Sequence, residues 1–193
     1  IRPDMSLKTE KLNLDRISNE AFYNTKGVII DSASTLTSNR GRYFMNQKKY
    51  RFTSNVVIDN PEYQVNSDQL DYYTELNQAY LFGNSKIEGE AYTIECERGF
   101  YDLDLEKGVF KKNATLYYDN KIIRGDSLYF ESEKDYAAAT KNVSIVDSLN
   151  NSIITGHYGE IFKAQDSAII TRRALAINII DQDSLFIHAD TLV

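Results

Sequence analysis

The segment Gly125-Asp126-Ser127-Leu128-Tyr129-Phe130, followed by Lys141-Asn142-Val143-Ser144-Ile145, decides how the chain is interpreted, because its pattern returns along the sequence. Working outward in steps of 29 residues, similar residues recur in the same register, and Phe162 continues the aromatic positions after a step of 32. Recurrence at a fixed period indicates a repeat protein. The ladders are aromatic (Tyr43, Tyr72, Tyr101, Phe130), aliphatic (Leu7, Leu36, Val65, Ile94, Ile123) and asparagine (Asn55, Asn84, Asn113, Asn142).

Around each asparagine the residues alternate between apolar and polar or mixed. In the copy around Asn55, for example, Phe52, Val56 and Ile58 share one parity, and Thr53 lies on the other. Such alternation indicates a strand with one buried face. Each repeat also contains two short turn signals, so we expect consecutive strands to form antiparallel hairpins.

The strand that carries the aliphatic and aromatic positions changes its buried parity partway along. Val65 and Tyr72 lie on opposite parities with Asp68 between them, and a Gly or Asp also separates the two parts in later copies (Gly99, Asp126). We interpret this switch as a bulge or bend that carries the strand from one sheet to another. The predicted fold is all-β: an elongated, open β-jellyroll of two facing antiparallel sheets, built from strand-turn-strand repeats, with edge strands at both ends. A parallel β-helix is the competing architecture, ranked second because its coils do not normally contain two tight reversals.

The repeats predict one domain over residues 1–193, with anchors near positions 12, 41, 70, 99, 128, 160 and 192. The last repeat is incomplete at Leu192-Val193, so we expect a longer parent protein. The chain begins Ile1-Arg2-Pro3 without a methionine or an apolar leader, which predicts either a mature secreted chain whose signal peptide was removed or a shortened chain.

Composition excludes several classes of protein. The 193 residues carry a net charge of −6, which argues against nucleic-acid binding. No apolar run is long enough to predict a membrane-spanning helix. One Cys cannot form an internal disulfide, and two His cannot make a His-rich metal site. We therefore predict neither a metal nor a cofactor.

The quoted segment resembles the repeat of the OstA-like, LptA family of lipopolysaccharide-transport proteins. Phe82-Gly83-Asn84 and Ser54-Asn55-Val56 match the second half of that repeat, and the resemblance extends from about residue 7 to residue 192. Gly precedes Asn only at Gly83, and Arg172-Arg173-Ala174 has lost the Asn. The resemblance implies a periplasmic carrier rather than an enzyme. It implies a jellyroll interior that holds lipopolysaccharide acyl chains, and open edge strands that join the module to itself or to other jellyroll transport components.

The apolar positions of the repeat are the candidates for binding lipopolysaccharide or a similar amphiphile. They would also be apolar in an ordinary core, and for the aromatic ladder core packing is favoured over lipid contact. The asparagines are interpreted as backbone geometry, because Asn tolerates a positive φ. The candidates are Phe52, Val56, Ile58, Leu81, Ile87, Phe110, Leu116, Val143, Ile145, Tyr72, Tyr101 and Phe130.

Two rival functions remain open. One is a structural or adhesive repeat protein, a spacer without a ligand. The other is a carbohydrate-acting β-helix, although no residue is nominated as catalytic. The acidic pairs, such as Asp102 with Asp104, are explained by a solvated strand face, and His157 and His188 are isolated. Cys96 shares a parity with Tyr92 and Ile94 and is predicted to be a small buried residue.

Overall fold

A computed structural model describes residues 5–30, 33–180 and 183–193. Within them the chain forms sixteen strands and two short 3₁₀ turns. From β7 onward the strands are long, and each is joined to the next by a short turn, as the repeat predicts. Their bounds are β1 (Ser6–Thr9), β2 (Asn13–Asp15), β3 (Glu20–Tyr23), β4 (Gly27–Ile30), β5 (Thr35–Ser38), β6 (Arg40–Phe44), η1 (Met45–Gln47), β7 (Lys49–Asp59), β8 (Tyr63–Tyr73), β9 (Gln78–Gly89), β10 (Tyr92–Asp102), β11 (Lys107–Tyr118), β12 (Lys121–Glu131), β13 (Tyr136–Asp147), β14 (Ser152–Phe162), η2 (Lys163–Gln165), β15 (Ser167–Ile180) and β16 (Asp183–Leu192).

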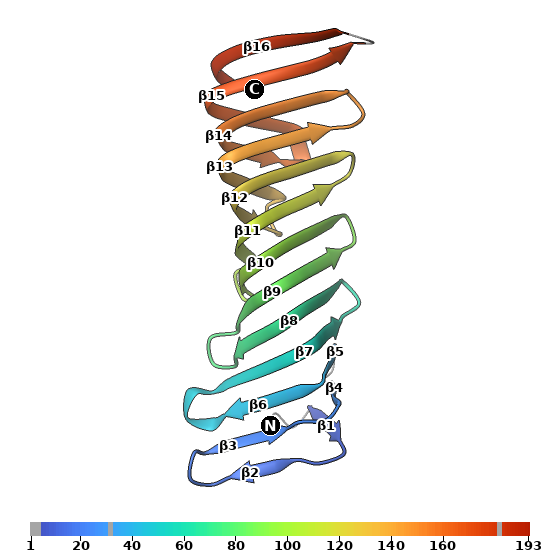
Figure 1. Cartoon of the computed structure of the whole chain (residues 1–193), viewed down its shortest axis with the longest axis vertical. Helices are drawn as coiled ribbons and strands as arrows, with labels where there is room; N and C mark the ends of the chain where they lie inside the picture. The colour runs from blue at the N-terminus through green and yellow to red at the C-terminus, as the bar shows by residue number, and fades with distance from the viewer. Residues whose placement is uncertain (1–4, 31–32, 181–182) are drawn as a thin grey trace. The chain divides into compact units, whose positions relative to one another are not determined.

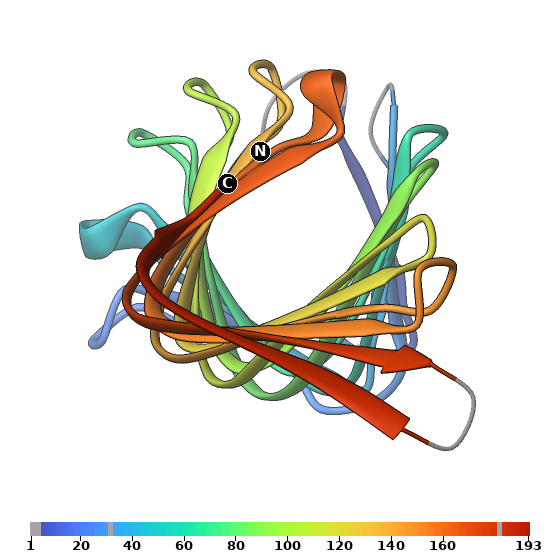
Figure 2. The ribbon, with the colours of Figure 1, turned by 90° about the horizontal axis from the view of Figure 1, so that it is seen from above.

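All sixteen strands belong to one open sheet, and the described strand registers are antiparallel. The all-β antiparallel jellyroll is therefore confirmed, and the alternative of a parallel β-helix is wrong. The two facing sheets of the prediction are two halves of the same strands. Each long strand runs through a first wall, bends, and continues through a second wall (Figure 2).

Left-handed residues in alternate strands produce the bend. Ser54-Asn55 in β7, Lys112-Asn113 in β11 and Lys141-Asn142 in β13 all have positive φ, and the register of pairing shifts at each of them. In β9 a single glycine, Gly83 at φ 79°, has a positive φ next to Asn84. The interpretation of the Asn ladder as backbone geometry is confirmed at Asn55, Asn113 and Asn142. The partner strands shift register beside Asp68 and Asp126, where the parity switch was noted.

Figure 1 labels the strands in chain order. The chain divides into two compact units, which are described separately. Unit 1 comprises residues 1–90 and 98–104, and unit 2 comprises residues 91–97 and 105–193. In each unit, wall A contains the strand halves next to one set of hairpin turns, such as 59–63 and 118–121. Wall B contains the halves next to the other set, such as 73–78 and 162–167.

The first strands of unit 1 are broken where later strands bend. β4 pairs with β1 and β5 in wall A, and β3 pairs with β2 and β6 in wall B. Tyr23, at the end of β3, fills the inner corner: a Cβ on Gly27 or Gly41 would lie 2.4 or 2.3 Å from its ring. Its hydroxyl is 2.8 Å from that of Ser38, which satisfies both buried groups.

The structure corrects one step of the aromatic ladder. Phe130 is opposite Ala137, and Ala137 is opposite Ile161, so Ile161 occupies the position that was assigned to Phe162. Phe162 lies on the other face of β14, with its ring 5.5 Å from that of Tyr136. The longer β13–β14 turn adds fewer residues than the predicted step required, and a one-residue error reverses the face of a side chain.

Candidate functional site

The interior of unit 1 is an apolar cluster to which both walls contribute. Ile29 and Val65 come from wall A, and Phe52, Leu70 and Leu81 from wall B. The candidates Phe52, Val56 and Leu81 are 3%, 1% and 4% exposed, so they are core residues in this structure. The structure therefore brings these predicted residues together, but in a packed state.

The wall A side of that interior is more open. Leu36 is opposite Ile58, Ile58 is opposite Val65, and Val65 is opposite Ile87, which makes one continuous inner row. Leu36 and the candidates Ile58 and Ile87 are only partly buried, and they pack against the cluster from its margin. They are apolar, inward-facing and reachable from solvent.

The corresponding row in unit 2 is buried on β11, β12 and β13, and it continues to the partly buried Ile154 and Ala176 and to Ile187, which is 47% exposed. Leu116 is opposite Ile123, and Ile123 is opposite Ile145. These three residues are 1%, 0% and 3% exposed. The other candidates of this unit, Phe110, Phe130 and Val143, are also fully buried. Near the C-terminal end, Ile170 fills the space over two glycines, since a Cβ on Gly156 or Gly159 would lie 2.6 Å from it.

The remaining candidates, Tyr72 and Tyr101, are half-buried at the wall B end of unit 1. The Tyr72 hydroxyl donates to Oδ1 of Asn77 at 2.7 Å. A ring that packs inward while its hydroxyl has a partner agrees with the interpretation of this ladder as core packing.

In unit 2 the tips of the two walls are joined by side chains that the sequence reasoning missed. We call this opening between the tips the mouth. Lys163, at the wall B tip, has a side chain that is 7% exposed and an Nζ 2.9 Å from Asp135. The same Nζ lies 4.5 Å from the ring centre of Tyr118 and 5.7 Å from that of Tyr92, both at the wall A tip. Tyr92 in turn has its ring 4.7 Å from that of Phe130.

A second contact spans the same mouth. Lys121 of wall A donates to Asp166 of wall B at 2.7 Å, and its Nζ lies 3.9 Å from Asp147. The hydrogen bond to Asp166 is the largest cause that raises the pKa of Lys121, so the charged form is favoured. Nothing in the spacing of these residues indicated this, because turn lysines usually lie in solvent. The signal lies only in the aromatic residues at the ends of β10 and β11.

The acidic positions at the bend have a structural role. Asn84 donates its backbone N–H to Asp68 at 2.8 Å, and the side-chain amides of Asn113 and Asn142 donate to Glu97 and Asp126 at 2.6 and 2.9 Å. The amide-to-carboxylate bonds fix the strands on both sides of the bulge.

Few of the described residues are suited to metal binding or to catalysis by His or Cys. Within residues 5–30, 33–180 and 183–193, no group of three His, Cys, Asp or Glu could hold a metal ion. His157 and His188 are exposed, and the buried Cys96 is 5% exposed, as predicted. Over the same described residues, no helix has the length and apolar character needed to span a membrane.

Comparison with known proteins gives a match to one family model and similarity to several solved structures. The family model of OstA-like proteins matches residues 3–68, which lie within unit 1. A crystal structure of LptH, the LptA homologous periplasmic component of the lipopolysaccharide transport device from Pseudomonas aeruginosa, is 19% identical. It matches over 51% of this chain and 75% of its own, with a TM-score of 0.46. No curated protein matches the chain. The resemblance to the OstA-like family that the repeats predicted is thus confirmed for residues 3–68, a stretch shorter than half of the chain.

Proposed function

We propose that this chain is a periplasmic module of lipopolysaccharide transport, a carrier that takes acyl chains between its two walls. The match of residues 3–68 to OstA-like proteins supports the class, and the apolar rows inside both units support the ligand. The observation that carries the proposal furthest is the half-buried inner row of unit 1, Leu36, Ile58 and Ile87. It offers apolar surface that a chain can cover without first displacing a sealed core.

The energetics favour an acyl chain over a small polar ligand. Each methylene that leaves water contributes about 0.8 kcal/mol, so a chain of ten methylenes gains roughly 8 kcal/mol before ordering costs. The net charge of −6 provides no general attraction for lipid phosphates. Affinity in this proposal therefore comes from the inner row, and unit 1 is the place where a chain enters.

A photo-crosslinking residue in place of Ile58 tests the proposal, because Val57 next to it provides a matched control. Ile58 faces the interior, whereas Val57 lies on the outer parity of the same strand. With purified lipopolysaccharide we expect an adduct at position 58 and little at position 57. Equal labelling at both positions, or none with the protein folded, would contradict a carrier interior in unit 1.

Edge strands are the proposed route to protein partners. β16 has β15 as its neighbour in the sheet order, and Leu185 and Ile187 on it are 52% and 47% exposed. An apolar strand with unpaired backbone groups is a template for another strand, from a second copy or from a related jellyroll.

Charges on this edge provide the test. We expect Leu185→Lys combined with Ile187→Lys to abolish any concentration-dependent association seen by sedimentation velocity. Leu149→Lys, at a turn position that is 77% exposed, is the control. Association that survives the paired substitution would move the proposed junction away from β16.

The second candidate function, a spacer without a ligand, is favoured by the buried inner residues of β11 and β12 in unit 2, where Phe110 and Ile123 are both 0% exposed. In that case native mass spectrometry of the folded protein would detect no lipopolysaccharide adduct. The wild-type chain and Ile58→Asp would then behave alike.

A further inference from the structure

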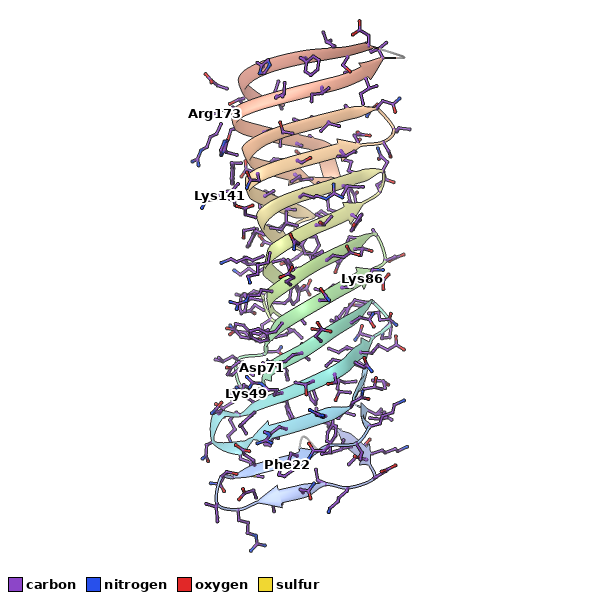
Figure 3. All side chains as sticks on the ribbon, viewed as in Figure 1. Phe22, Lys49, Asp71, Lys86, Lys141 and Arg173 are labelled. Atoms are coloured by element: carbon purple, nitrogen blue, oxygen red, sulfur yellow. The ribbon has the colours of Figure 1, made fainter. Side chains whose placement is uncertain are left out.

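The outer side of the bend in unit 2 carries a row of cations, which we call the basic ridge: Lys111, Lys112, Lys141, Arg172 and Arg173. All five are exposed. They lie on β11, β13 and β15, which are alternate strands, so the groups of the row follow one another at about 10 Å. Figure 3 shows Lys141 and Arg173 pointing away from the ribbon.

Four of these side chains occupy backbone positions that other residue types fill more easily. Lys112, Lys141, Arg172 and Arg173 have φ between 58° and 64°. The left-handed region suits Gly and Asn and costs other residues about 1 kcal/mol or more. Unit 1 has Ser54-Asn55 and Gly83-Asn84 at the corresponding bends. Residues held in an unfavoured conformation are a reason to look for a function.

The ridge stays positively charged locally. Three carboxylates lie at the same bend, fewer than the five cations: Glu97 and Asp126 accept hydrogen bonds from Asn113 and Asn142, and Asp190 of β16 lies opposite Arg172 and Arg173. Among the described residues, none of the five cations forms an ion pair. Any anion that binds here meets side chains that need not give up another partner.

An apolar stripe lies beside the ridge on the outer face of wall A. On β15, Leu175, Ile177 and Ile179 follow Arg173 at alternate positions and so share its face. Ile177 is opposite Phe186, which is 58% exposed. We call this row the outer stripe; the strand registers extend it across five strands as Ile122, Val146, Ile153, Ile177 and Phe186.

The same outer row in unit 1 is more polar. It reads Thr35, Asp59, Gln64 and Glu88 across β5, β7, β8 and β9. The combination of an apolar row with a neighbouring line of cations is therefore a property of unit 2. It does not follow from the repeat, which would give both units the same outer face.

From this combination we propose that the outer face of wall A in unit 2 docks on an anionic lipid bilayer surface. Lys and Arg near such a surface are attracted to the lipid phosphates, and aliphatic and phenyl side chains enter the interfacial region. A soluble polyanion would use the ridge alone and would leave the outer stripe in water. This inference is independent of the proposed carrier function, because the interior is not involved.

The chain contains no Trp, so Phe186→Trp gives a reporter of a single site. With vesicles of equimolar phosphatidylcholine and phosphatidylglycerol, we expect its emission to shift to the blue and to be quenched by brominated lipid. Vesicles of phosphatidylcholine alone should produce no change. Gln64→Trp, on the same outer row of unit 1, is the matched reporter and should not respond.

A second experiment removes ridge charges by substitution to Asn, which tolerates the left-handed backbone at these positions. Lys112→Asn, Lys141→Asn and Arg172→Asn together remove three ridge cations at left-handed positions, and we expect partition onto the mixed vesicles to fall roughly a hundred-fold, about five-fold per cation. Lys8→Asn, Lys26→Asn and Lys48→Asn change the net charge equally away from the ridge, and Lys48 is also left-handed at φ 49°. This control protein should bind as the wild type does.

Three results would overturn the proposal. They are no vesicle binding at low salt, an equal loss of binding in the ridge and control proteins, and tight binding of dextran sulfate while the Phe186→Trp reporter does not respond to the vesicles. The last result would assign the ridge to a linear polyanion instead.

Discussion

Both units bury a lysine side chain, and the two lysines do different things. In unit 1 Lys49 is 10% exposed and pairs with Asp71 at 3.4 Å on the outer face of wall B, where Arg51 also binds Asp71 through two hydrogen bonds. In unit 2 Lys163 reaches from wall B to the rings of Tyr118 and Tyr92 in wall A. The first lysine strengthens one wall, and the second holds two walls together.

The inner rows of the two units also differ in how exposed their side chains are. Ile58 and Ile87 of unit 1 are partly exposed, whereas Leu116 and Ile145 of unit 2 are buried. One repeat sequence has thus produced an inner row that solvent can reach in unit 1 and a row that is buried on β11 to β13 of unit 2. The comparison teaches that side chains at the hairpin tips, rather than the repeat itself, decide whether the interior is open.

The largest expected effect comes from removing the anion in unit 1. Asp71→Asn leaves Lys49 buried without its counter-ion, and we expect a loss of about 3–5 kcal/mol in the free energy of unfolding. Urea denaturation followed by circular dichroism measures this loss. A change below about 1 kcal/mol would mean that Lys49 finds water or another partner, and its role as a wall element would then be abandoned.

Lys163→Met tests the mouth of unit 2. The substitution keeps the volume but removes the cation from three aromatic rings, while Asp135, whose side chain is 53% exposed, remains solvated. We expect a loss of about 2 kcal/mol and faster hydrogen exchange in β11 and β12. Lys49→Met is the matched control and should leave exchange in those strands unchanged. Protection that stays the same in both variants would refute the closing role of Lys163.

The bends of the two units should respond with opposite signs. Lys141→Gly relieves a left-handed lysine, and we expect a gain of roughly 0.5–1 kcal/mol. Gly83→Ala imposes a side chain at φ 79°, with its Cβ 2.4 Å from the Asp68 carboxylate, and we expect a loss of about 1 kcal/mol or more. Thermal melts of the two proteins suffice, and a loss in both would show that the bend of unit 2 requires lysine.

The smallest effect belongs to Lys121→Gln. Because the Asp166 side chain is 79% exposed, solvent screens the pair, and we expect only about 0.5 kcal/mol. The pKa of Lys121 is raised, so this contribution is complete at neutral pH and disappears as the pH rises above the ordinary lysine pKa. Melting temperatures of wild type and variant should therefore converge at strongly alkaline pH. A difference that grows there would contradict the pairing.

Much of the fold was predictable because a repeat reports its own geometry many times over. The asparagine ladder predicted left-handed backbone, and Asn55, Asn113 and Asn142 have it. The inner rows were predicted from the alternation of apolar and polar residues. That alternation indicates which face a side chain lies on, but not how far the opposite wall is from it. For that reason Ile58 and Ile145 looked equivalent in the sequence and differ in exposure.

What remained out of reach depends on contacts between distant residues. Lys121 and Asp166 are separated by 45 positions, and Tyr23 lies over two glycines from different strands. Phe162 shows a further limit, because an error of an odd number of residues in the expected length of a turn reverses the face of the side chains that follow it. Whether the candidates contact lipid stays a prediction.

The contacts across the mouth also bear on how the molecule folds. Stacked hairpins contact mainly their neighbours, so a repeat sheet can fold or unfold one hairpin at a time from its end. Lys163, in the turn between β14 and β15, packs against Tyr118 at the end of β11, and the weaker Lys121–Asp166 bond joins the same two regions. These contacts couple the β11–β12 hairpin to the β14–β15 turn, so that neither can unfold without disturbing the other. Unit 2 is therefore expected to unfold in a single sharp transition, and the open end of unit 1 to fray strand by strand.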